Sequence, residues 1–249
     1  MKTFLSWYLG CLLVLHMSAC RESKYFAQKG LFDKSLYEAA IQDAMYVNES
    51  KVYKELVAIN KSNEQLIWKQ IDGEDYLLVV TWKQNMIHYS AHVDSLFYNT
   101  ANYPIWVTTA PELLERIKSE QVTDVNRRLR QLLGLPPNAA YFYFIEFWVR
   151  PQDLFRPCLD KEISDSKCEL CVPAKKNDPH ISWMDKNRVE RYYNCALYQQ
   201  YPWTQLGYTY DWNPKNKTHV GLSEFVIGKN KNIVVKGIYT TEMYLKNTQ

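Results

Sequence analysis

Residues Tyr141 to Leu170, YFYFIEFWVRPQDLFRPCLDKEISDSKCEL, decide the fold of this chain. The stretch begins with an almost wholly apolar run, Tyr141 to Val149, in which Glu146 is the one acid. A strand that is apolar on both faces is typical of the middle of a sheet, because each face needs cover. After Arg150 the chain becomes dense in Asp, Glu, Arg, Pro and Cys. We therefore expect a central strand over residues 141–150 that runs into a polar loop, where a functional site would most naturally lie.

Helices and strands are expected on both sides of this central strand. The capping pair Ser35 and Glu38 predicts a helix start, and apolar residues at helical spacing continue to Ile59, in one long helix or in two that break near Asn48. Asp72-Gly73 between two apolar runs predicts a hairpin. Other expected elements are strands over residues 86–93, 104–108 and 206–212, helices over 109–118, 124–133 and 183–200, and a closing hairpin of 220–227 with 233–244.

These elements predict a single α+β domain over residues 32–249. We find no internal repeat, no low-complexity segment and no linker that would mark a domain boundary. We expect a largely antiparallel central sheet with helices packed on one side and a disulfide-stapled loop insertion. Arg127, Arg128 and Arg130 give the helix at 124–133 a basic face, which we interpret as solvated surface.

The first 20 residues have the pattern of a targeting segment. Lys2 supplies a positive start, residues 4–17 an apolar core, and Met17-Ser18-Ala19 precede Cys20. This segment resembles a bacterial lipoprotein signal, and the resemblance implies removal of residues 1–19 and lipidation of Cys20. Residues 20–31 would then be a tether that anchors the chain to an outer or periplasm-facing membrane of the cell envelope. The alternative is an ordinary secretory signal cut near Ala19, which would leave a secreted protein.

The charge balance gives no reason to expect a nucleic-acid partner. The formal net charge is +3, and loss of residues 1–19 removes only Lys2 from it. A nearly neutral chain has no strong field to attract polyanions. The partners that we expect are therefore the membrane, through the lipid anchor, and an envelope ligand or protein of unknown identity.

Four cysteines remain once Cys11 leaves with the signal and Cys20 is lipidated. They are Cys158, Cys168, Cys171 and Cys195, an even number in an oxidising compartment. We favour the pairs Cys158–Cys168 and Cys171–Cys195, because the first closes a short local loop after the central strand. A four-cysteine zinc site that uses Cys168 and Cys171 is one alternative, and a thioredoxin-like redox pair is another. On the favoured interpretation the chain needs no cofactor and no metal.

Motifs for known chemistries are missing from the sequence. It contains no Gly-x-Gly-x-x-Gly, P-loop, Gly-x-Ser-x-Gly or His-Glu-x-x-His pattern. Three blocks, residues 146–158, 201–212 and 220–226, resemble those of an uncharacterised bacterial protein family. That resemblance implies no activity, and no functional residue can be transferred from it.

Aromatic side chains beside charged ones give the main functional hypothesis. Alternate residues of a strand over 206–212 would place rings on one face, and such a row can hold flat apolar ligands. We predict a non-catalytic module that binds a ligand or partner in a groove lined by Trp148, Arg150, Arg156, Tyr208, Tyr210, Trp212 and Glu224.

The alternative hypothesis is an envelope hydrolase that uses two acids as general acid and base. It requires that two carboxylates converge in an open cleft. The candidates are Glu146, Asp153, Asp160, Asp211 and Glu224. A structural Arg–carboxylate network is the competing interpretation of the same residues, with Arg150 and Arg156 as the nearest partners for Glu146.

Overall fold

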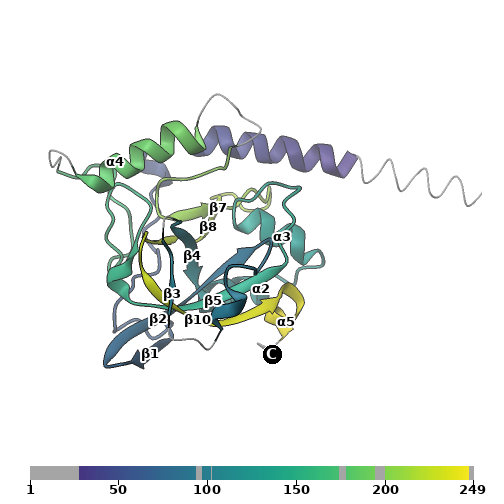
Figure 1. Ribbon diagram of the computed structural model, residues 1–249. Coiled ribbons are helices and arrows are strands. Elements are labelled where there is room, and N and C mark those ends of the chain that lie inside the picture. The colour runs from purple at the N-terminus through teal and green to yellow at the C-terminus, as the bar shows by residue number, and fades with distance from the viewer. Residues whose placement is uncertain (1–27, 94–96, 102, 174–177, 194–199, 247–249) are drawn as a thin grey trace, which may run out of the picture.

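A large antiparallel sheet forms the centre of the molecule in the computed structural model (Figure 1). The structure describes residues 28–93, 97–101, 103–173, 178–193 and 200–246. The strand order is β3-β10-β5-β2-β4-β9-β6, and β1 pairs with the first half of β2. The expected α+β class, the antiparallel sheet and the disulfide-closed loop are all confirmed.

The expected central strand is β5, Tyr143–Val149, and it lies between β10, Asn232–Thr240, and β2, Glu74–Lys83. Ile145, Phe147 and Val149 are fully buried in the core on one face of the sheet. Phe144 and Trp148 are buried in the core on the other face. The need for cover on both faces explains the apolar run.

The first hairpin forms as its turn sequence predicts. Strand β1, Trp68–Ile71, pairs with β2 across Asp72-Gly73. Both turn residues have positive φ, 50° at Asp72 and 81° at Gly73. A two-residue turn of this kind favours glycine, since a side chain strains the left-handed region.

The C-terminal strands do not form the expected hairpin. Strand β9, Phe225–Ile227, pairs with β4, Ile105–Thr109, and with β6, Leu154–Phe155, whereas β10 pairs with β5 and β3. Three strands separate β9 from β10 in the sheet. At about 4.8 Å per strand, the link 228–231 could not cross a flat sheet with its maximum reach of about 3.5 Å per residue. The sheet therefore curls, and Asn230 N donates to Ala101 O at 2.7 Å where its ends approach.

Residues 86–93 are not the third strand that their composition predicts. They form turns and the short 3-10 helix η2, Ser90–His92. The edge strand is instead β3, Tyr98–Asn99, which pairs with β10. The ring of Tyr89 is buried 5.4 Å from that of Phe147, so this turn covers the inside of the curl.

Three helices cover the outer face of the sheet. They are α2, Ala110–Ser119, α3, Val125–Leu132, and α5, Thr241–Lys246. The first two confirm the helices expected at 109–118 and 124–133, and all three contribute apolar residues to the core over β2 and β5. Asp124 caps α3, because its carboxylate accepts from Arg127 N at 3.1 Å.

A second layer lies across one end of the curled sheet (Figure 1). It contains the helix over residues 28–44, α4, Pro179–Lys186, and the π-helix η4, Asn187–Tyr192. The first helix already includes Ser35, so the helix start predicted there was wrong. Between residue 44 and Ile59 the chain forms only the short 3-10 helix η1, Glu49–Lys51, and not the expected continuation of the helix. Tyr37 and Ile41 pack against Tyr210 and Trp212, which belong to or follow the small sheet of β7, Tyr208–Tyr210, and β8, Val220–Ser223.

Candidate functional site

The groove expected from the aromatic and arginine residues does not form. Tyr208 is buried beside the Cys158–Cys168 disulfide, while Tyr210 and Trp212 pack under the first helix. Trp148 is buried on the outer face of the sheet, among the helices. The structure thus disperses these rings among separate cores, and of the seven predicted groove residues it brings Tyr210 and Glu224 to a common cavity.

The arginines of the predicted groove are structural. Arg156 is fully buried, and its guanidinium donates to Asp165 at 2.6 Å and to the carbonyl of Lys167 at 3.0 Å. Arg150 donates to Asp153 at 2.9 Å, and Lys231 lies 3.1 Å from the other oxygen of that carboxylate. These contacts hold the junction between β5 and the polar loop, as the competing interpretation expects.

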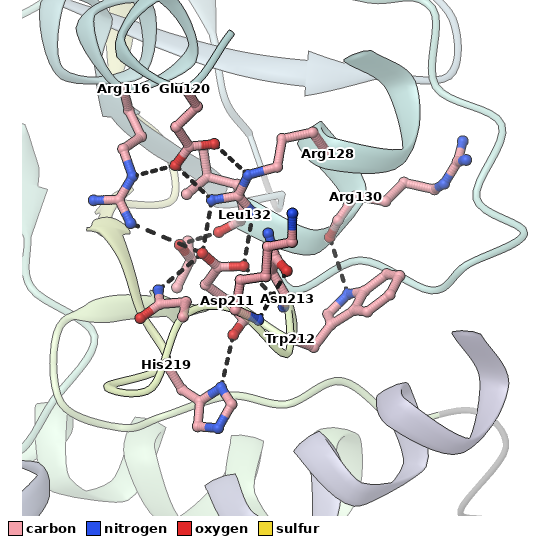
Figure 2. Close-up of polar contacts among 12 residues, drawn as sticks. Arg116, Glu120, Arg128, Arg130, Leu132, Asp211, Trp212, Asn213 and His219 are labelled. Atoms are coloured by element: carbon pink, nitrogen blue, oxygen red, sulfur yellow. Dashed lines mark hydrogen bonds and ion pairs between the residues drawn. The ribbon is translucent and has the colours of Figure 1, made fainter. Parts of the chain in front are cut away.

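A buried network of charges joins α2, α3 and the residues after β7 (Figure 2). Arg128 donates two hydrogen bonds of 2.7 Å to Asp211, which is fully buried. The same guanidinium also bonds Glu120, which in turn accepts from Arg116 at 2.8 Å. The interpretation of Arg128 as solvated surface was therefore wrong, because the side chain is 5% exposed. A bidentate pair with further hydrogen bonds is the arrangement that makes a buried charge tolerable.

The five candidate carboxylates do not converge. Glu146 accepts from Lys236 at 2.7 Å and from Tyr244 at 3.1 Å, rather than from either arginine named for it. Asp211 and Asp153 are paired as described above, and Asp160 accepts from the backbone N–H of Glu162 in the polar loop. Glu224 is the one of the five that lines the cavity.

The cavity lies between the outer face of the sheet and the second layer. Its volume is about 240 Å³. Its lining includes the end of β2, part of β4, the end of η4 and the segment 201–203. Parts of β7, the loop after α3 and Glu224, between β8 and β9, complete it.

Aromatic rings form much of the cavity wall. Trp106, Tyr192 and Trp203 lie in mutual contact, with ring centroids 5.0 to 6.1 Å apart. The indole N–H groups of Trp106 and Trp203 are buried and have no acceptor among the described residues. Unpaired donors of this kind are uncommon in a finished core. This wall therefore differs from the satisfied network around Arg128.

Two ionisable side chains of opposite sign enter the cavity without a partner. Lys83, at the end of β2, and Glu224 form no side-chain hydrogen bond or ion pair with any described residue. Burial lowers the pKa of Lys83 to about 8, helped by the nearby charge of Arg191. Burial alone raises the pKa of Glu224 to about 8. Both side chains keep some accessible surface because the cavity reaches them.

A second enclosed acid, Glu112, makes a useful contrast. Burial raises its pKa to about 7, and hydrogen bonds from Ser223 and Thr108 oppose that shift. Ser223 N donates to it at 2.8 Å and Ser223 Oγ at 3.0 Å. Glu112 thus links α2 to β8 through hydrogen bonds, whereas the side chain of Glu224, the residue after Ser223, makes no such bonds to the described residues.

Sequence reasoning missed Lys83, Trp106 and Arg191 as cavity residues. Each lies in a segment that resembles ordinary strand or helix, and no local pattern distinguishes it. Lys83 is the one with a usable signal, since it ends an apolar strand where burial would leave a charge unpaired.

The cysteines follow the expected scheme in part. Cys158 and Cys168 form the predicted disulfide. With its sulfur bonded to Cys158, Cys168 is available neither to the four-cysteine zinc site nor to a Cys168-x-x-Cys171 pair. Cys171 is a free, exposed cysteine. Its expected partner, Cys195, lies outside the described residues, so that pairing stays a prediction.

The targeting segment and Cys20 also lie outside the described residues. Within the described part of the chain, none of the helices has the length and apolar character to cross a membrane. The same residues contain no group of three or more His, Cys, Asp or Glu side chains placed to hold a metal ion.

Comparison with known proteins adds no relative. No protein-family model matches the chain, and no curated protein or solved structure is significantly similar to it. The proposed function therefore depends on the residues that line the cavity.

Proposed function

We propose that this chain is an envelope lipoprotein, anchored through Cys20, whose domain is a non-catalytic module that binds a small ligand. The observation that carries the binding role is the cavity itself. It is lined by aromatic rings, and it contains Lys83 and Glu224, which have no partner among the residues that the structure describes. A mostly apolar cavity with a few converging polar groups is the usual form of a small-molecule site.

Binding can be measured through the tryptophans of the cavity wall. Full-length protein in mild detergent would be titrated with amino acids, ω-amino acids, monosaccharides, nucleosides and short fatty acids while tryptophan fluorescence is recorded. We expect a saturable change with at least one class, weakened at least tenfold in the double variant Lys83→Met with Glu224→Gln. The matched control, Lys69→Met with Glu64→Gln, changes the same residue types outside the cavity and should bind as the wild type does. No saturable response to any class would contradict the binding role.

The anchor has an independent test in a bacterial host with an outer membrane. The Cys20→Ala variant should move from the membrane fraction to the soluble fraction, because the lipidated thiol is gone. The control is Cys11→Ala, the same change within the part of the signal that is removed. Membrane association that persists in Cys20→Ala, or a wild type that is soluble, would contradict lipidation.

A further inference from the structure

We infer that the cavity takes a small zwitterion, with the ligand's ammonium group at Glu224 and its anionic group at Lys83. This inference rests on the proposed binding function and adds the chemical class of the ligand. It starts from two ionisable side chains of opposite sign that line one cavity from different elements, the end of β2 and the link between β8 and β9.

Three other enclosed acids show how charged side chains are stabilised elsewhere in the molecule. Asp211 is paired with Arg128, and Glu146 is paired with Lys236. Burial raises the pKa of Glu112, and hydroxyl and backbone donors from Thr108 and Ser223 hold its carboxylate. Lys83 and Glu224 differ from these because neither has a partner among the described residues, and they do not pair with each other. Among the described residues, neither side of the cavity therefore supplies a partner that would favour the charged form of these two groups.

The ligand charges follow from the cost of leaving an enclosed charge unpaired. An isolated ion loses its hydration and gains nothing in return. An anion alone would compensate Lys83 and leave Glu224 uncompensated, and a cation alone would do the reverse. A neutral sugar could stack on the rings but would compensate neither charge. A zwitterion compensates both at once.

The surroundings of each charge favour this orientation. Burial raises the pKa of Tyr192; the charge of Arg191 opposes that effect and the charge of Glu224 adds to it, so the Glu224 carboxylate lies near the aromatic wall. A carboxylate beside tryptophan and tyrosine rings suits an ammonium group, which also gains from the ring faces. Arg191 lines the cavity and its charge lowers the pKa of Lys83, and its guanidinium also lies 5.5 Å from the centroid of the Tyr192 ring. Two cations together suit a carboxylate or phosphate.

The size of the cavity suits a small ligand. One water needs at least about 10–15 Å³ of such volume, so 240 Å³ has room for a molecule of the size of an amino acid. The ligand class is therefore a small amino acid or a similar ammonium–acid compound.

A series of ω-amino acids tests both charges and the distance between them. Full-length protein would be titrated with 4-aminobutyrate, 6-aminohexanoate and 8-aminooctanoate, followed by tryptophan fluorescence. Hexylamine and hexanoate supply one charge each, and glucose supplies none. We expect at least one zwitterion to bind at least tenfold more tightly than hexylamine, hexanoate or glucose.

Single variants assign the two ends. Glu224→Gln should weaken zwitterion binding at least tenfold and leave hexanoate binding unchanged or tighter, and Lys83→Met should do the same with hexylamine in place of hexanoate. Circular dichroism would confirm that both variants fold. Equal binding of one-charge probes, or loss of both probes in each variant, would overturn the zwitterion. Binding of glucose or nucleosides instead of zwitterions would overturn the zwitterionic ligand but not the binding function. If none of the compounds binds, both the zwitterionic ligand and the binding function are overturned.

Discussion

At the scale of single residues, the enclosed charges divide by whether the chain supplies their partners. Arg128 and Asp211 satisfy each other in the network of Figure 2, with 2.7 Å contacts. Lys83 and Glu224 have no such contacts within the described part of the chain, and burial moves the pKa of each to about 8. Groups with shifted pKa values in a cavity are typical of functional sites. The first pair holds the fold together, whereas we propose that the second binds the charged groups of a ligand.

Glu224 has no partner among the described residues, so we predict that the free energy of unfolding falls as its carboxyl group loses its proton. Its pKa in the folded protein, about 8, exceeds the ordinary value of 4.5, so the folded chain holds the proton more tightly than the unfolded chain does. The stability this proton contributes is fully present below pH 4.5 and is lost as the pH rises to about 8. Glu224→Gln should remove this loss, and at pH 8.5 it should exceed the wild type by at least about 1 kcal/mol, or 2–4 °C in Tm.

Thermal unfolding from pH 4.5 to 8.5 without ligand measures this difference. The control is Glu64→Gln, which neutralises an exposed acid and should give the wild-type profile. Parallel curves for Glu224→Gln and the wild type would mean that the Glu224 carboxylate is solvated or paired.

The Arg128 network predicts the opposite effect of losing a charge. Arg128→Ala leaves Asp211 buried without its partner, so we expect the free energy of unfolding to fall by about 3–5 kcal/mol. Arg130→Ala on the same helix should cost less than about 1 kcal/mol, because that guanidinium points away from the network in Figure 2. Denaturant unfolding of the two variants compares them directly, and similar losses would contradict the assignment.

At the scale of elements, local sequence patterns predicted where strands lie better than they predicted which strands pair. The apolar run of β5 and the Asp72-Gly73 turn both specify structure through nearby residues, and both form as expected. The hairpin expected at 220–244 failed because alternation and a turn signal cannot tell which strands pair. Residues 86–93 failed for another reason, since Tyr89 is buried by tertiary packing and not by strand pairing.

Gly207, at the junction between the polar loop and the small sheet, lies where we expect any side chain to lower the stability. At Gly207, φ is +76°, and an added Cβ would lie 2.6 Å from Cδ of Arg156 and 2.8 Å from Sγ of Cys168. Gly207→Ala should therefore lower stability by about 1–3 kcal/mol. Gly30→Ala is the matched change, with nothing within 4 Å in the first helix, and should raise stability by up to about 1 kcal/mol. Thermal unfolding that ranks the two variants the other way would contradict this packing.

At the scale of the whole molecule, the curled sheet and the second layer create the site. Lys83 and Glu224 are far apart in the sequence, and they meet because β2, β4 and the link before β9 border one space under η4. No spacing rule could predict that meeting. Of the residues proposed from the sequence, Glu224 and Tyr210 reach the cavity, because an acid and a ring beside short strands were visible locally. No local pattern pointed to Lys83, Trp106 and Arg191, which also line the cavity.

The central claim is that one ligand compensates Lys83 and Glu224 together, and proton counting tests it most directly. Calorimetric titration with the tightest-binding ω-amino acid at pH 8, in buffers of different ionisation enthalpy, gives the protons exchanged on binding. With both pKa values about 8, binding should release about half a proton from Glu224 and take up about half at Lys83, so the wild type exchanges almost none. Lys83→Met should then show net release, and Glu224→Gln net uptake. The same proton count in both variants would contradict the claim.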